Sequence, residues 1–235
     1  MNVLAIDTAT ETLSVALLQS GKVTETMALT TKNDHATHLM PTIVKVMEKA
    51  RLQPENIDEI VVGNGPGSYT GTRIGITTAK TIAWSLEVAT YSVSSLEAIA
   101  FFAKDDANLI CPFIDARRNA VYTGLYKISE GKLLNKIEDT HVSVDKWLSQ
   151  LDKMEETICF ISPHLENYQS MFSEILKDKA VFFPIKEQNI IAENLLKIYQ
   201  KYDDVNVHSV IPNYIRKTEA EIKLEQQLKG ELNRD

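Results

Sequence analysis

Residues 63–75 hold five of the nine glycines of this 235-residue chain. The apolar run 57–62 precedes them and an uninterrupted run from Ile74 to Leu86 follows, which predicts a strand, a glycine-rich turn and a helix. Such a layout can bind phosphate through backbone amides at a helix N-terminus. It contains neither Gly-Lys-Ser/Thr nor Gly-x-Gly-x-x-Gly, so spacing alone favours a tight strand-to-helix crossover whose glycines permit close packing.

Two aspartates occupy equivalent places in two similar halves of the chain. Asp7 and Asp115 each end an apolar run, and a second strand-like run follows each of them. The step from the aspartate to the aligned leucine is the same, from Asp7 to Leu17 and from Asp115 to Leu125. This repetition predicts an internal duplication of a unit of three antiparallel strands. Chance similarity of two hairpins is the alternative.

Histidine and cysteine are the other residue types that could hold a metal ion or act as nucleophiles. His35 and His38 lie at the start of a predicted helix, where solvated or capping roles are the simpler interpretation. Cys111 and Cys159 lie in apolar runs without metal-type spacing, so we expect reduced core residues. We therefore predict no metal site, no catalytic residue and no bound cofactor.

The elements that must position these residues alternate between strands and helices. We predict an α/β protein of two lobes, residues 1–105 and 106–235, each a mixed sheet with flanking helices. The last roughly 20 residues are expected to form a helix able to pack back on the first lobe. The predicted helices are 33–50, 74–86, 95–104, 144–154, 167–177, 189–201 and 218–229, and a capping box, Ser94-x-x-Glu97, opens the third.

The first two helices carry candidate contact residues. Apolar side chains of the first helix span an arc of roughly 160°, wider than the roughly 100° that one core contact needs. Trp84 lies on the polar face of the second helix. It either anchors a partner protein or packs over the aliphatic stems of its neighbours. The predicted partner or dimer interface comprises His35, Leu39, Met40, Ile43, Met47, Tyr69, Arg73, Thr77, Lys80 and Trp84.

Composition describes an ordinary soluble protein rather than a nucleic-acid or membrane protein. The mass is 26.4 kDa, with 44% hydrophobic and 24% charged residues. A net charge of −7 and a pI near 5.3 argue against nucleic-acid binding over most of the surface. No basic leader and no run of roughly 18 apolar residues occurs, so we expect a cytoplasmic protein without a membrane partner.

Two lobes with an aspartate after each first strand resemble the actin, hexokinase and sugar-kinase superfamily, which has a ribonuclease H-like fold. There each aspartate belongs to a turn, usually Asp-x-Gly, that meets ATP phosphates and their metal ion, and the glycine lets phosphate approach the backbone. This chain has Asp7-Thr8-Ala9 and Asp115-Ala116-Arg117 instead. The resemblance therefore implies that Asp7, Thr8 and Asp115 belong to vestigial nucleotide turns.

The closer resemblance is to the TsaB (YeaZ) family. Its matching pieces follow the family's order along nearly the whole chain: residues 3–10, 35–41, 63–75, 93–98, 114–117 and 212–216. TsaD, the catalytic relative, has a His-x-Glu-Gly-His motif whose two histidines correspond here to Ser95 and Ile99. Two histidines four residues apart on a helix can hold a metal ion, whereas isoleucine cannot, so Ser95 is expected to cap the helix instead.

By this resemblance the chain is a non-catalytic scaffold that pairs with TsaD through its first two helices and forms a homodimer when alone. The TsaE ATPase joins that pair, and the complex modifies the adenosine 3′ of the anticodon in tRNAs that read codons beginning with A. This chain would meet tRNA only through the complex. The 63–75 loop would then set the second helix tightly against the first.

Two other functions remain open at this stage. One is a small-molecule kinase of the sugar-kinase type, with Asp7 and Asp115 near phosphate. The other is a protease, although Ser68 lies in no Gly-x-Ser-x-Gly elbow.

Overall fold

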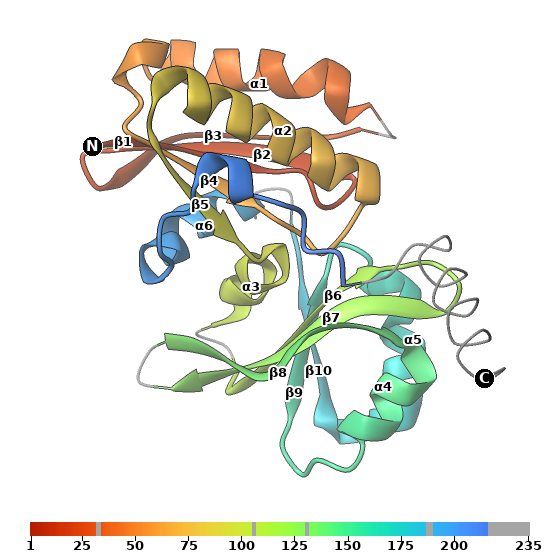
Figure 1. Cartoon of the computed structure of the whole chain (residues 1–235). Helices are drawn as coiled ribbons and strands as arrows, with labels where there is room; N and C mark the ends of the chain where they lie inside the picture. Colours follow the sequence, from red (N-terminus) through yellow and green to blue (C-terminus); the bar gives the residue numbers. More distant parts are fainter. Residues whose placement is uncertain (32–33, 105–106, 130–131, 187–189, 216–235) are drawn as a thin grey trace, which may run out of the picture.

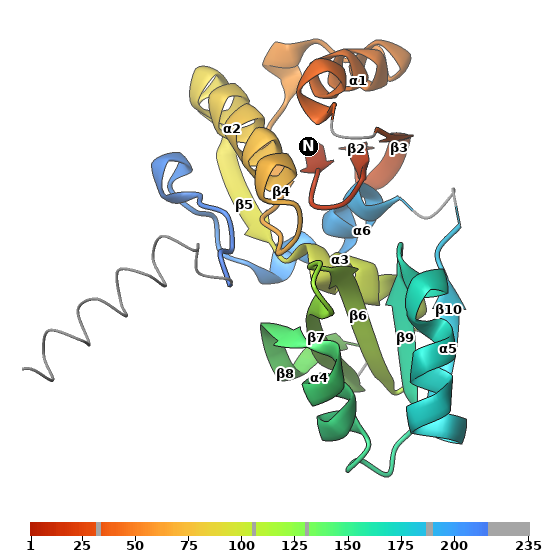
Figure 2. The same ribbon diagram turned by 90° about the vertical axis from the view of Figure 1, so that its right-hand side faces the viewer.

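A computed structural model describes residues 1–31, 34–104, 107–129, 132–186 and 190–215 of the chain. These residues form two lobes, each built on a five-stranded sheet (Figure 1). Figure 2 shows two helices, α3 and α6, between the sheets. No helix among the described residues is long and apolar enough to cross a membrane.

The first sheet has the order β3-β2-β1-β4-β5. β1 pairs antiparallel with β2 and parallel with β4, and its residues 3–7 are all buried, which is why they read as a continuous apolar run up to Asp7. The carboxyl ends of β1 and β4 therefore lie side by side. The strands are β1 (Asn2–Asp7), β2 (Thr12–Gln19), β3 (Lys22–Thr30), β4 (Glu59–Gly63) and β5 (Ala89–Val93).

The second sheet repeats this topology, in the order β10-β9-β6-β7-β8. β6 takes the place of β1, since it pairs antiparallel with β7 and parallel with β9. The two-lobed fold predicted from the sequence is confirmed, and the matching strand orders support its origin by duplication. The strands are β6 (Leu109–Asp115), β7 (Ala120–Ser129), β8 (Lys132–Ser143), β9 (Ile158–Ser162) and β10 (Ala180–Pro184).

Helices cover both faces of each sheet. α1 (His35–Lys49) and α2 (Tyr69–Leu86) cover the outer face of the first sheet, and α4 (Val144–Leu151) and α5 (Leu165–Leu176) cover that of the second (Figure 1). α3 (Ser95–Ala100) packs on β6 and β7 of the second sheet.

α6 (Ile191–Ile198) comes late in the chain but packs on β1, β2 and β4 of the first sheet. The amide of Ala192 donates to Ser14 Oγ at 3.1 Å, and Asn194 Nδ2 donates to the carbonyl of Ala98 in α3 at 2.8 Å. Residues 202–215 then run along the first lobe, where Val210 is buried in the same core as α1 and α2. The described end of the chain therefore belongs to the packing of the first lobe.

Several helix ends differ from the sequence prediction. α3 ends at Ala100 and α6 at Ile198, and each continues as a short 3₁₀ turn, a common way for a last helical turn to tighten. α4 stops at Leu151, and α5 begins at Leu165. The helix predicted for 218–229 lies outside the described residues.

Candidate functional site

Asp7, the last residue of β1, is buried inside the protein. Its carboxylate is fully buried, with Ser95 Oγ donating to Oδ2 at 2.5 Å and the amide of Ala9 donating to Oδ1 at 3.1 Å. Burial raises the pKa of this carboxyl, although the hydrogen bond from Ser95 acts in the opposite direction. Ser94, not Ser95, caps α3, because its hydroxyl accepts from the amide of Glu97. The cap indicated by the Ser94-x-x-Glu97 spacing is thus confirmed, and the expectation that Ser95 caps the helix is wrong.

The glycine-rich loop covers the Asp7-Thr8-Ala9 turn. The amide of Ser68 donates to the carbonyl of Ala9 at 2.7 Å, and Thr8 Oγ1 donates to the carbonyl of Gly71 at 2.8 Å. A Cβ on Gly67 would lie 2.2 Å from the carbonyl oxygen of Ala9. Protein atoms thus fill the space between the loop and one side of the turn. The loop packs the start of α2 against this turn, and α2 also contacts α1, as expected.

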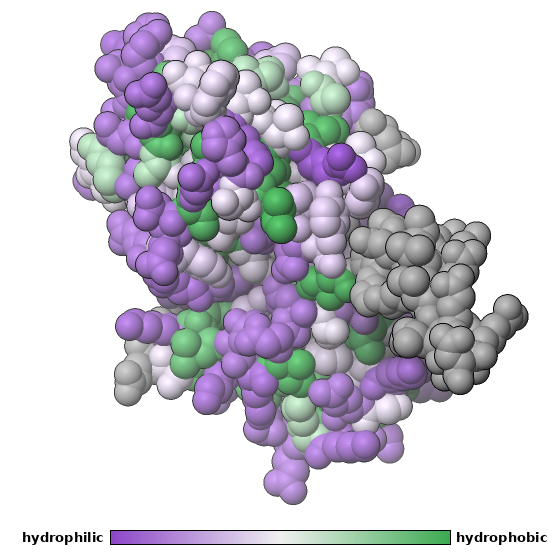
Figure 3. Space-filling model, in the orientation of Figure 1, coloured by the Kyte–Doolittle hydropathy of each residue, from purple (hydrophilic) through white to green (hydrophobic). Residues whose placement is uncertain are grey.

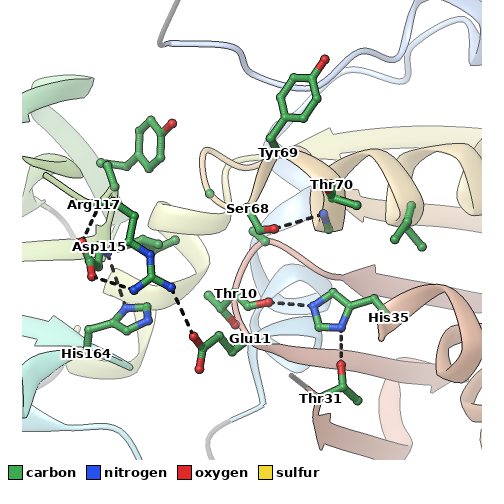
Figure 4. Close-up of a pocket in the computed structure, with 17 residues that line it drawn as sticks. Thr10, Glu11, Thr31, His35, Ser68, Tyr69, Thr70, Asp115, Arg117 and His164 are labelled. Carbon is green, nitrogen blue, oxygen red and sulfur yellow. Dashed lines mark hydrogen bonds and ion pairs between the residues drawn. The ribbon is translucent and has the colours of Figure 1, made fainter. Parts of the chain in front are cut away.

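A cavity of about 360 Å³ remains between the lobes, beside the covered turn (Figure 4). Arg117 reaches across it from the second lobe, with its guanidinium 3.7 Å from Glu11 and 3.7 Å from Asp115. The amide of Arg117 also donates to Asp115 Oδ1 at 2.7 Å. The lining residues are Ala9, Thr10, Glu11, Thr31, His35, Gly67, Ser68, Tyr69, Thr70, Gly71, Ile74, Ile114, Asp115, Ala116, Arg117, Tyr122 and His164.

The charges in this cavity do not favour a polyphosphate. Glu11 and Asp115 carry two negative charges against the single positive charge of Arg117. His164 adds little positive charge at neutral pH, because burial lowers its pKa. Without a divalent cation, the cavity therefore suits a neutral or zwitterionic polar group better than an ATP phosphate chain.

The nucleophile-type side chains at this cavity are engaged in structural hydrogen bonds. Ser68 Oγ accepts from the amide of Gly71 and caps α2. His35 is buried between Thr31 Oγ1 at 2.6 Å and the carbonyl of Thr10 at 2.8 Å (Figure 4). Both cysteines are buried. No group of three or more His, Cys, Asp or Glu in the described part of the chain could hold a metal ion.

Four of the five α1 candidates are not available to a partner. The side chains of Leu39, Ile43 and Met47 lie in the core of the first lobe, and His35 is buried in the hydrogen bonds described above. This corrects the expectation that these four side chains form an interface. Met40 is 47% exposed, and Val44, which the prediction omitted, is 47% exposed one turn further along the same face. The excess apolar arc is thus mostly core, with a narrow exposed strip.

The α2 candidates are mostly at the surface. Arg73, Thr77 and Trp84 are exposed, whereas Lys80 is not free for a partner, because its ammonium donates to the carbonyls of His208 at 3.0 Å and Val210 at 3.1 Å. This corrects the expectation for Lys80. Figure 3 shows hydrophobic side chains reaching the surface of the first lobe between polar ones.

Tyr69 is exposed and lies against a residue that the prediction missed. Its ring centroid is 5.5 Å from that of Tyr214, and Arg73 donates to its hydroxyl at 2.6 Å. Tyr214 is itself 49% exposed. It lies in the 212–216 segment that carried part of the family resemblance, and that resemblance was the sequence feature that could have pointed to Tyr214.

Comparison with known proteins identifies the family. A family model described as TsaD, tRNA N6-adenosine threonylcarbamoyltransferase, matches residues 23–224. The tRNA threonylcarbamoyladenosine biosynthesis protein TsaB of Bacillus subtilis is 35% identical over 223 residues, which cover 95% of this chain and 97% of that protein. This chain belongs to the TsaB (YeaZ) family. TsaB of Escherichia coli is 36% identical over 132 residues, 55% of this chain and 57% of that protein.

Solved structures agree with this TsaB assignment at the level of the fold. YeaZ from Pseudomonas aeruginosa is 25% identical, has a TM-score of 0.74 and covers 91% of this chain and 99% of its own. A second structure from that organism, described as similar to the peptidase YeaZ, is 24% identical and has a TM-score of 0.76. It covers 92% of this chain and 99% of its own.

At the two positions where TsaD is expected to carry metal-binding histidines, this TsaB family member has residues with other roles. Ser95 binds Asp7 at the junction of the lobes, and Ile99 is fully buried in the hydrophobic core.

Proposed function

We propose that this chain takes part in tRNA threonylcarbamoyladenosine biosynthesis as the non-catalytic partner of TsaD. The observation that carries the proposal is the match to Bacillus subtilis TsaB along 95% of the chain. The covered Asp7 turn supports a non-catalytic role, because the loop amide of Ser68 and the Asp7 carboxylate already have partners within the chain. The complex would act on the adenosine 3′ of the anticodon in tRNAs that read codons beginning with A, in the cytoplasm.

The exposed face of α1 and α2 is the proposed contact surface for TsaD, and for a second copy of this chain when TsaD is absent. Met40 and Val44 supply apolar area, and Arg73, Thr77 and Trp84 supply exposed side chains on α2. Exposed aromatic and apolar side chains of this kind are typical interface anchors. TsaE would join the pair, and tRNA would meet this chain only through the complex, in keeping with its net charge of −7.

The test is co-purification with TsaD, followed by the transfer assay with and without this chain. A Met40→Asp, Val44→Asp variant should lose co-elution and fail to support transfer. Val181→Asp in the second lobe is the matched control, since Val181 has a similar exposure of 48% and lies on β10, far from α1 and α2 in Figure 1. Wild-type chain that does not co-elute with TsaD would contradict the proposal.

A small-molecule kinase is the second candidate, because the cavity between the lobes could admit a small substrate. Titration with ATP and magnesium separates the two functions. Tight binding followed by phosphoryl transfer to a small molecule would overturn the non-catalytic role.

A further inference from the structure

An open groove of about 770 Å³ lies at the C-terminal end of α2. The last turn of α2 and the start of β5 form one wall, and residues 204–208 form the other. Its lining residues are Ala83, Trp84, Ser85, Glu87, Val88, Ala89, Asp204, Val205, Asn206, Val207 and His208. The interlobe cavity shares none of these residues, so the groove is a separate feature.

The groove is held in shape by hydrogen bonds within the chain. The amide of Val205 donates to the carbonyl of Thr90 at 2.8 Å, and Asn206 Oδ1 accepts from the amide of His208 at 2.9 Å. Lys80 anchors the same segment by donating to the carbonyl of His208 at 3.0 Å. A ligand would therefore meet a surface that needs little ordering, which favours binding.

The electrostatics of the groove favour a cation. Glu87 and Asp204 both line it and are both exposed, and no lysine or arginine is among its lining residues. The carbonyl end of the 18-residue helix α2 also points here, and its last turn carries no basic residue. A helix C-terminus carries a partial negative charge that attracts cations. These three sources of negative potential outnumber the one nearby cation, Lys80, whose ammonium is bonded to the carbonyls of His208 and Val210, and they disfavour nucleic acid.

An indole and an apolar floor complete the groove. Trp84 is 65% exposed, and Val88, Val205 and Val207 line the surface beside it. A guanidinium stacks well on an aromatic face, and its aliphatic stem can cover apolar side chains.

We propose that this groove binds an arginine side chain of TsaD, with the guanidinium between Trp84, Glu87 and Asp204. The identity of the partner depends on the function proposed above, whereas the preference for a cation depends only on the groove. The contact would extend the α1/α2 surface toward the C-terminal end of α2.

The two tryptophans make the binding directly observable. Trp147 is 2% exposed and donates its indole N–H to Cys111 Sγ, whereas Trp84 is exposed. In a ¹H–¹⁵N spectrum of the full chain, the peptide acetyl-Ala-Arg-Ala-amide should shift the Trp84 indole signal and leave that of Trp147 in place. The same peptide with citrulline, which is similar in shape but uncharged, should bind much more weakly. Equal shifts with both peptides, or a shift produced by an RNA oligonucleotide, would overturn the proposal.

A Glu87→Gln, Asp204→Asn variant should bind the arginine peptide about threefold to tenfold more weakly, the range expected for two exposed charge pairs. Glu55→Gln, Asp178→Asn is the matched control, because these carboxylates are exposed and outside the groove. The groove variant should also bind TsaD more weakly, most clearly at low salt. Unchanged affinity for peptide or for TsaD would overturn the proposal. Failure of wild-type chain to bind TsaD, with the arginine peptide still bound, would instead contradict the proposed function.

Discussion

Replacement of Gly75 by alanine tests whether the glycine-rich loop is packed against the Asp7 turn as the structure describes. Two effects oppose each other. In an ordinary helix interior this change stabilises a protein by roughly 0.5–1 kcal/mol. Here the new Cβ would lie 2.2 Å from Thr8 Oγ1. That hydroxyl is held in place by its hydrogen bond to the carbonyl of Gly71.

The steric clash should outweigh the gain in helix propensity. Overpacking a tight interior typically destabilises a protein by about 1–3 kcal/mol, and a 2.2 Å approach belongs to the upper part of that range. After the gain in helix propensity we therefore expect a net loss of up to about 2.5 kcal/mol in the free energy of unfolding. Thr8→Ala alone should lower it by about 1 kcal/mol, because a buried hydrogen bond is lost. In the double variant the nearest remaining side-chain atom, Thr8 Cβ, lies at an acceptable 3.4 Å. The two changes should therefore be less damaging together than their sum.

Urea denaturation with a constant m-value measures these differences. Gly71→Ala is the matched control, because its Cβ would lie 2.3 Å from the backbone carbonyl of Thr8, which Thr8→Ala leaves in place. Thr8→Ala should therefore rescue Gly75→Ala and not Gly71→Ala. The packing argument is refuted if Gly75→Ala matches or exceeds the wild type in stability, or if both glycine variants are rescued equally.

Three further results are expected. Met40→Asp should reduce self-association in analytical ultracentrifugation while changing the free energy of unfolding by no more than about 0.5 kcal/mol. Leu39→Ala should lower the free energy of unfolding by about 2–5 kcal/mol, because that side chain is buried. Equal destabilisation by the two changes would contradict the assignment of Met40 to the surface and Leu39 to the core. Burial raises the pKa of Asp7 in the folded state above 3.8, so its contribution to stability is fully present below that pH and is lost as pH rises. Urea denaturation from about pH 4 to about pH 7 should thus show Asp7→Asn gaining stability relative to the wild type, and a constant difference would contradict the assignment. Burial raises the pKa of Cys111 to about 12, so its alkylation by iodoacetamide should require unfolding, and rapid labelling of folded protein would show that the thiol is accessible.

The fold was largely predictable because its signals are local. Apolar runs that end in Asp7 and Asp115 marked the two first strands, and their repeated spacing indicated the duplication that the matching sheets support. The capping-box spacing of Ser94 and Glu97 marked the start of α3, which begins at Ser95 with Ser94 as its cap. Each of these features depends on residues close together in the sequence.

The surface predictions were less accurate because burial depends on distant partners. Lys80 looked like a free surface cation, but its acceptors lie 128 and 130 residues later in the chain. The wide apolar arc of α1 contains Leu39 and Ile43, which pack into the core of the first lobe. Periodicity shows that a face is apolar, but it does not show whether a sheet or a partner covers it.

The glycine-rich loop links the covered turn to the exposed helix face. Because Gly67 and Gly71 lack side chains, the loop can reach the Asp7-Thr8-Ala9 turn and form hydrogen bonds with its backbone and with Thr8. The same contacts fix the start of α2, and with it the direction in which Arg73 and Trp84 face solvent. A side chain on Gly67 or Gly71 would push the loop off the turn, because its Cβ would lie 2.2 or 2.3 Å from a backbone carbonyl oxygen. The packing of the loop on the Asp7 turn is therefore also the packing that orients the proposed contact surface for TsaD.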